Sequence, residues 1–146
     1  MKSELSLRLV LVEPPASIDY GIQRGRGSNY EAMFVQQRKR GDVTFDVSIA
    51  VSENSEDGSP NFSGEFVQGT PARRFIYIDV GTYAGQRDTP WSRRMIVRLD
   101  DIAWPMIRQA TTSGKRLEAR IQGTGSDGGP SCATVRPIGG WRVVSD

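Results

Sequence analysis

The sequence contains no histidine and only one cysteine, Cys132, and these two shortages exclude several kinds of site. Without histidine the chain cannot form Ser-His or Cys-His catalytic pairs or the usual transition-metal centres. One thiol cannot form an intrachain disulfide or a thiolate zinc site within one chain, which is compatible with a reducing compartment. Any chemistry must therefore use carboxylates, Arg, Lys, Tyr, Ser, Thr or the single thiol, and we expect neither a metal nor a cofactor.

Long apolar runs are also missing from the 146 residues. No segment approaches the roughly 20 apolar residues that span a bilayer. The N-terminal apolar run is interrupted by Arg8, ends at Glu13 and lacks a small-residue cleavage site, so it predicts a first strand and not a signal peptide. We expect a single β-rich cytoplasmic domain that spans residues 1–146 and has no membrane contact.

Apolar and polar residues alternate in five segments, and this period of two is typical of strands with one face in the core and one in water. Two short runs, 132–137 and 141–144, add candidate strands. With Gly, Pro and Asp turns in between, the pattern predicts a mainly β (β-rich α+β) fold. We expect an antiparallel barrel or sandwich of about six to eight strands with one α-helix packed against it. The apolar members of the five segments are Leu5, Leu7, Leu9 and Leu11; Val43, Phe45, Val47, Ile49 and Val51; Ile76, Ile78 and Val80; Met95, Val97 and Leu99; and Leu117, Ala119 and Ile121.

One helix is predicted within residues 99–114, LDDIAWPMIRQATTSG. Asp100 or Asp101 would cap its first turn, Pro105 lies early enough to be tolerated, and Gly114 supplies the stop. The apolar stripe that would face the sheet comprises Ile102, Met106, Ile107 and Ala110.

Residues 28–40 fit two interpretations. Ser28 and Glu31 match a capping box, which predicts a helix. The run MFVQQRKRGDVTFDV instead fits a hairpin with its turn near Gly41, and the clear strand that follows favours the hairpin.

The stretch from Arg73 to Leu99 predicts two strands joined by a connection that is rich in recognition-type side chains. Aromatic residues and Arg carry a disproportionate share of the binding energy at interfaces. We therefore expect a ligand or partner to bind here, through Tyr83, Gln86, Trp91, Arg93 and Arg94.

Arginine dominates the basic residues, since sixteen Arg and three Lys make up the nineteen, yet the net charge is only +2. Arg recognises phosphate and carboxylate in a planar, bidentate way. A solvated surface rich in Arg accounts for the same composition and is the simpler interpretation. The sequence pI of about 8.9 falls short of the strong basic bias of nucleic-acid-binding domains, so a nucleic-acid partner is disfavoured without being excluded.

Asp79 is the strongest candidate for acid–base chemistry. It falls on the strand face opposite Ile76 and Ile78, and a carboxylate held among aromatic neighbours can act with a raised pKa. Paired with Asp88 or Asp127, it could hydrolyse a glycosidic bond if the two carboxylates lie about 5 to 9.5 Å apart. The simpler interpretation is that Asp79 accepts hydrogen bonds from loop amides.

Two further motifs have structural interpretations. Gly123, Gly125 and Gly128 match the spacing of a dinucleotide-binding loop, but Pro130 and a strand-like run follow, so we expect a tight turn. Cys132 lies where a buried strand would begin. No histidine or helix start is near enough to lower its pKa, so we expect a small core residue.

A family resemblance is carried by two long runs, FSGEFVQGTPARRFIYIDVGTYAGQRDTPWSRRMIVRLDDIAW and LEARIQGTGSDGGPSCATV. They resemble an uncharacterised bacterial family, domain of unknown function 5990. Its most specific pieces are G-x-F-x-Q-G at Gly64 to Gly69, A-G-Q at Ala84 to Gln86 and W-x-R-R at Trp91 to Arg94. The resemblance extends from about Leu7 to Val144 and implies a single domain, but it implies no activity, cofactor or catalytic residue.

These observations favour a non-catalytic binding or interaction domain whose Arg/aromatic loop recognises an anionic small molecule or a protein partner. Two alternatives stay open: a His-free hydrolase that uses a carboxylate pair, and a structural protein that works through self-association. No motif specifies the ligand or the oligomeric state.

Overall fold

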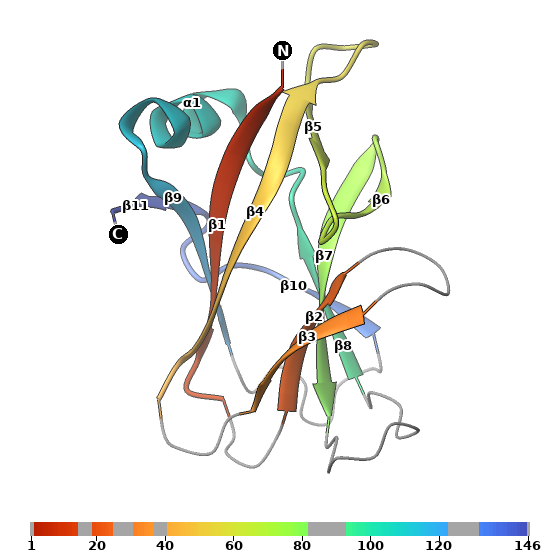
Figure 1. The fold of residues 1–146 in the computed structure, drawn as a ribbon, viewed down its shortest axis with the longest axis vertical. Coiled ribbons are helices and arrows are strands. Elements are labelled where there is room, and N and C mark those ends of the chain that lie inside the picture. Colours follow the sequence, from red (N-terminus) through yellow and green to blue (C-terminus); the bar gives the residue numbers. More distant parts are fainter. Residues whose placement is uncertain are drawn as a thin grey trace.

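The computed structural model describes residues 2–14, 19–24, 31–36, 41–81, 93–122 and 132–145. Within these residues, eleven strands form two sheets that are packed together, and one helix lies beside β1 and β9 (Figure 1). The arrangement is a sandwich, and its described strands do not close into a barrel. It confirms the β-rich fold with one helix. The strands outnumber the sequence prediction, and two that it missed, Pro60–Ser63 and Gln68–Thr70, are too short to show a period of two.

The first sheet, sheet A, has the strand order β11-β9-β1-β4-β5. Its central strand β1 (Ser3–Val12) pairs antiparallel with β4 (Val43–Glu53) and parallel with β9 (Arg116–Gln122). The two outer strands are β5 (Pro60–Ser63) and β11 (Arg142–Val144). The parallel pairing brings the beginning of the chain beside a segment close to its end.

The second sheet, sheet B, has the strand order β10-β8-β7-β2-β3, and a short strand, β6, pairs with β7 outside this order. Strand β10 runs parallel to β8, whereas the other pairings of the sheet are antiparallel. Both sheets are therefore mixed. The strands are β2 (Asp19–Arg24), β3 (Glu31–Gln36), β6 (Gln68–Thr70), β7 (Arg73–Gly81), β8 (Arg93–Arg98) and β10 (Cys132–Val135).

The alternating apolar residues of the two sheets meet in one core. In β4 every second residue from Val43 to Val51 is buried, as the period of two predicts. The connection between β5 and β6 adds Phe66 and Val67 to the same core. Sheet B contributes Tyr20, Ile22, Ile76, Ile78, Met95 and Val97, all of them almost fully buried.

The helix α1 (Trp104–Ser113) begins later than its predicted caps. The N-cap residue is Ala103, which makes no side-chain hydrogen bond to the first turn, so the prediction of Asp100 or Asp101 as cap is wrong. Asp100 instead forms an ion pair with Arg98 at the end of β8. The Asp100 carboxylate, which the sequence assigned to the helix cap, therefore binds the Arg98 guanidinium instead.

The other end and the apolar stripe of α1 agree with the sequence. Gly114 is the C-cap in the left-handed region, with φ of 66°, a conformation that glycine adopts without steric cost. Ile107 and Ala110 are buried against the core, as is Ile102 just before the helix, and Met106 packs partly against it. The helix packs mainly against β1, β9 and β11.

Within residues 28–40, the described part 31–36 is the strand β3, so the extended interpretation is right there. The predicted hairpin across Gly41 is wrong, however, because β3 pairs with β2 in sheet B, whereas β4 pairs with β1 and β5 in sheet A. The chain changes sheets between β3 and β4, which a local alternation pattern cannot reveal. Residues 28–30 and 37–40 lie outside the described residues.

Candidate functional site

The connection between β7 and β8, which the sequence predicted to be a binding loop, falls largely outside the described residues. The predicted residues that lie outside are the ligand-binding candidates Tyr83, Gln86 and Trp91 and the carboxylates Asp88 and Asp127 of the hydrolase alternative. Arg93 begins β8, and only its backbone is described. Arg94, the next residue, is described in full. The connection leaves β7 at Gly81 and enters β8 at Arg93, so its C-terminal end adjoins Arg94.

Asp79 and Arg94 lie opposite each other on the outer face of sheet B, the face turned away from the core. The Nε atom of Arg94 donates to Oδ1 of Asp79 at 2.7 Å. On the other side, Nε2 of Gln23 in β2 donates to Oδ2 of Asp79 at 2.7 Å. Gly21 is the β2 residue opposite Asp79, and Gln23 lies two positions further along β2, on the same face. Two neighbouring strands thus hold one carboxylate between them.

The Asp79 carboxylate is completely buried, with 0% of the residue exposed. Burial raises the pKa of Asp79 above its usual value of 3.8, and the hydrogen bonds from Arg94 and Gln23 counteract part of that rise. Within the described residues its partners are side chains and not the loop amides that the sequence suggested. The carboxylate is therefore a buried charge with two dedicated donors.

Arg94 is held on a second side by an aromatic ring. Its guanidinium carbon lies 4.2 Å from the centroid of the Tyr77 ring, a cation–π contact. The Tyr77 ring in turn contacts Phe75, with the centroids 4.8 Å apart and the planes tilted by 55°. The Arg94 side chain keeps 31% of its surface exposed. We call the five residues Gln23, Phe75, Tyr77, Asp79 and Arg94 the outer-face cluster.

Sequence reasoning found only part of this cluster. It singled out Arg94 as a binding residue and placed Asp79 on the outer face, but it missed Gln23 and the contact between Tyr77 and Arg94. The run DYGIQR carried a usable signal, because buried Tyr20 and Ile22 alternate with other residues there. The alternation places Gln23 on the outer face of its strand. It does not show that Gln23 lies beside Asp79, because the pairing of β2 with β7 cannot be inferred from the sequence.

The arrangement is better suited to fixing a guanidinium than to transferring a proton. Both oxygens of Asp79 already accept hydrogen bonds. Arg94, by contrast, has a defined orientation and a partly exposed side chain. The cluster therefore presents a positively charged planar group, the Arg94 guanidinium, which is held by the Asp79 carboxylate and stacked on the Tyr77 ring.

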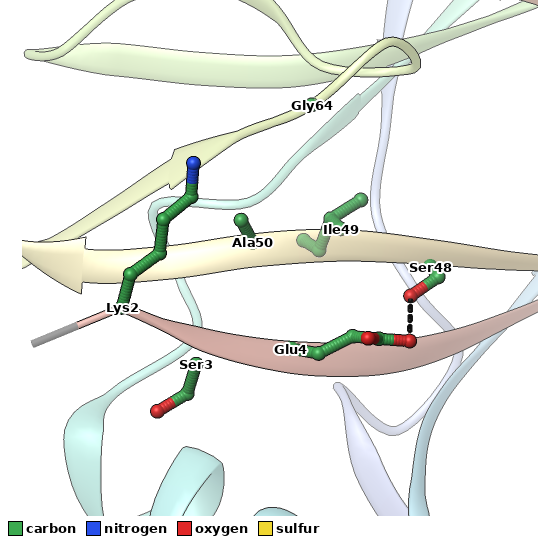
Figure 2. Close-up of a pocket in the computed structure, with 7 residues that line it drawn as sticks. All are labelled: Lys2, Ser3, Glu4, Ser48, Ile49, Ala50 and Gly64. Atoms are coloured by element: carbon green, nitrogen blue, oxygen red, sulfur yellow. Dashed lines mark hydrogen bonds between the residues drawn. The ribbon is translucent and has the colours of Figure 1, made fainter.

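A second candidate, a hollow on sheet A, lies apart from this cluster (Figure 2). Its volume is about 450 Å³, and it opens broadly to solvent above Ala50. The Oγ atom of Ser48 donates to the Glu4 carboxylate at 2.7 Å across it. The polar side chains at its rim, including Lys2 and Glu4, are exposed and none is fixed by burial. The lining residues are Lys2, Ser3, Glu4, Ser48, Ile49, Ala50 and Gly64.

The described residues contain no group of three or more His, Cys, Asp or Glu side chains placed to hold a metal ion. In the same part of the chain, no helix is long and apolar enough to cross a membrane. Cys132 lies opposite Arg94 in the β8–β10 register, but its side chain is outside the description, as is the run 123–130, so the core and turn predictions for them stay predictions.

The G-x-F-x-Q-G signature, Gly64 to Gly69, has a structural explanation. Phe66 is buried in the core, and Gln68 begins β6 opposite Phe75. Gly69 has φ of 95°, and a Cβ atom there would lie 2.2 Å from the Arg73 carbonyl oxygen. Only glycine fits this close approach. The signature residues Gln68 and Gly69 therefore belong to the short strand β6, which pairs with β7 beside Phe75 of the outer-face cluster.

Comparison with known proteins agrees with these motifs. The sequence model of a family described as "Family of unknown function (DUF5990)" matches residues 5–144, nearly the whole chain. The resemblance inferred from the motifs is therefore confirmed. No curated protein and no solved structure matches the chain.

Proposed function

This chain belongs to DUF5990, a family of unknown function, and from its own residues we propose a non-catalytic binding domain that recognises an anionic group. The binding site in this proposal is the connection between β7 and β8 together with the start of β8. Its ligand is an anionic small molecule or an anionic group on a partner, and its setting is the cytoplasm, in keeping with the lone Cys132.

The observation that carries the proposal is the fixed position of Arg94. Asp79 and Tyr77 restrain its guanidinium from two sides, so little side-chain freedom remains to be lost when a ligand binds. A buried ion pair adds little net stability compared with apolar residues of the same volume. The Asp79–Arg94 ion pair adjoins the end of a connection whose sequence is rich in Arg and aromatic residues. This position favours a role for the ion pair in positioning that connection.

Within this proposal Arg93 and Arg94 have different roles. Asp79 neutralises part of the Arg94 charge, so Arg94 is a positioning residue that sets the end of the connection. Arg93 precedes it directly and supplies the charge that contacts the anion. Tyr83 and Trp91 add flat apolar contacts, and Gln86 adds a hydrogen bond.

The proposal is tested by titrating pyrophosphate into three proteins at constant ionic strength, with calorimetry and thermal unfolding as readouts. Wild type is expected to bind and to show a raised Tm. Arg93→Gln removes the contacting charge and should lose most of that response. Arg108→Gln removes the same charge from an exposed position on α1 and should respond like wild type. An equal response from all three proteins, or none from wild type, contradicts the proposal.

The hydrolase alternative keeps one supporting observation, because burial raises the pKa of Asp79 toward the range of a general acid. It needs a second carboxylate, from Asp88 or Asp127, and the release of Asp79 from at least one of its two donors. Turnover of a chromogenic aryl glycoside by wild type, abolished in Asp79→Asn, would establish this alternative.

A further inference from the structure

The long strand β4 is paired on one of its two sides for only part of its length. Strand β1 pairs with it continuously from Val43 to Val51, whereas β5 pairs on the other side with residues 50–53 only. Figure 1 shows β5 beside the C-terminal end of β4, with the rest of β4 extending past it. No other described strand pairs with β4. Among the described parts of the chain, residues 43–49 therefore form an open edge of sheet A, which we call the β4 edge.

Gly64 determines where this edge begins. It follows the last residue of β5, and its φ of 132° lies in the region that favours glycine. A Cβ atom at Gly64 would lie 3.7 Å from the Ile49 Cα atom, so the chain turns away directly beside Ile49 before it continues to β6 in sheet B. The hollow on sheet A borders the same point, because Ile49, Ala50 and Gly64 all line it (Figure 2). The β4–β5 ladder thus ends at a glycine turn, and the hollow opens next to its end.

The β4 edge lacks the features that keep an exposed strand from pairing with another chain. Such features include short length, Pro, bulges and unmatched charges. The edge residues, VTFDVSI, contain no Pro, Gly, Lys or Arg, and the continuous register with β1 leaves no bulge. Their one charge, on Asp46, is matched by Arg8 at 2.8 Å. The other outer strands of sheet A are shorter, since β5 has four residues that include Pro60 and β11 has three.

We propose that the β4 edge binds the same edge of a second copy of this chain, antiparallel about a twofold axis. Main-chain N–H and C=O groups of the two copies complete a ladder that joins their A sheets into one. A second copy is favoured over an unrelated peptide, because copies of the chain are always present and the β4 edge has no feature that keeps them apart. The proposal concerns sheet A and is independent of the anion site at β7 and β8.

Charge and the position of β5 select one register for this pairing. Full overlap of residues 43–49 sets the Asp46 carboxylates of the two copies opposite each other, which is unfavourable. A shift by one residue turns core side chains to the solvent face, so the nearest alternatives are the two shifts by two residues. One of them places Ala50 opposite Thr44, although Ala50 is already paired with β5. The other is centred on Phe45 and sets Asp46 opposite the Thr44 hydroxyl of the second copy, so it is the register that we propose.

Sedimentation equilibrium, with light scattering after size exclusion, measures this pairing in the full chain. Wild type should form a concentration-dependent dimer of twice the 16.1 kDa chain mass. Thr44→Asp sets a carboxylate opposite Asp46 at two symmetric positions, so it should weaken the dimer about tenfold. Thr44→Lys sets an ammonium group there and should leave the dimer at least as tight as in wild type. Thr112→Asp adds the same charge as Thr44→Asp to an exposed position on α1 and is the matched control, with wild-type affinity.

Hydrogen exchange of wild type alone keeps the proposal open to contradiction if a Thr44 variant fails to fold. Amides of the β4 edge that point away from β1 should exchange faster on dilution to the monomer, whereas those of α1, which packs mainly against β1, β9 and β11, should change little. A chain that stays monomeric at every concentration leaves the edge to a different partner and overturns the proposal. A dimer that Thr44→Asp does not weaken, or whose edge amides do not respond to dilution, pairs through another surface and overturns it as well.

Discussion

Asp79 is a buried carboxylate whose ionisation destabilises the fold unless Arg94 compensates its charge. A strand position on the outer face of a sheet usually meets water, yet this carboxylate is fully buried and has a raised pKa. The Asp79 carboxyl therefore binds its proton more tightly in the folded protein than in the unfolded chain. The contribution of Asp79 to stability is therefore greatest below about pH 4 and declines as pH rises through the folded pKa. Arg94 limits that decline, because it compensates the ionised form.

Removal of Arg94 should therefore destabilise the protein in a pH-dependent way. We expect Arg94→Met to lower the free energy of unfolding by about 2–3 kcal/mol at pH 7, because it leaves a buried carboxylate without its charged partner. Near pH 4 the loss should shrink, since a protonated Asp79 needs no cation. Urea unfolding at both pH values measures this difference.

Arg98→Met is the matched control for this experiment. The ion pair of Arg98 with Asp100 is partly exposed on both sides, so its loss should cost less than about 1 kcal/mol. A loss for Arg94→Met that is equally small, or that does not change with pH, would contradict the view that Arg94 compensates a buried charge.

At the scale of an element, the short strand β6 is held by a close backbone approach. Arg74 of β7 donates from Nη1 to the Gly69 carbonyl oxygen at 2.6 Å, and it also donates from Nε to Asn61 Oδ1 at 3.4 Å. Arg74 is itself buried, so it is a structural link between β6 and β7. This close approach is possible because Gly69 has no side chain.

Gly69→Ala should disrupt this element much more than the same change elsewhere. The added Cβ would lie 2.2 Å from the Arg73 carbonyl oxygen and 2.8 Å from Cε1 of Phe75, both too close for ordinary contact. In Gly58→Ala the backbone φ is also positive, at 73°, but no atom lies within 4 Å of the new Cβ. We expect Gly58→Ala to cost about 1 kcal/mol and Gly69→Ala at least about 2 kcal/mol more. Equal midpoints of thermal unfolding for the two variants would contradict this explanation.

At the scale of the whole molecule, the sandwich is organised around β1. This strand is hydrogen-bonded on both sides, to β4 and to β9, and its four leucines are almost completely buried. Its pairing with β9 joins Leu7 to Leu117, so sheet A is complete only when distant parts of the chain have come together. A mixed sheet with such long-range pairing orders late and opens as a unit.

Hydrogen exchange followed by NMR should reflect this organisation. We expect the β1 amides to exchange most slowly among the described strands, because their opening requires both ladders to separate. The outer strands β5 and β11, each paired on one side within sheet A, should exchange faster. Amides of β5 or β11 that were protected as strongly as those of β1 would show that β1 is not the centre of the cooperative unit.

The sequence by itself determined the positions of the long strands, the buried face of each and the apolar stripe of α1. Periodicity is a local property that burial selects directly. The same sequence excluded histidine and disulfide chemistry and identified the family through Gly69 and the other signature residues. It also drew attention to Asp79 and Arg94, though as separate candidates for catalysis and binding.

Only the tertiary structure decided which strands are neighbours and therefore which side chains meet. The pairing of β3 with β2, the parallel ladders and the contact of Gln23 with Asp79 across 56 positions of sequence all depend on how the two sheets cover one core. Local patterns carry no record of such long-range packing, because several pairings bury the same apolar faces. The physical meaning of Asp79 and Arg94, a buried charge and its restrained partner, follows from that packing alone.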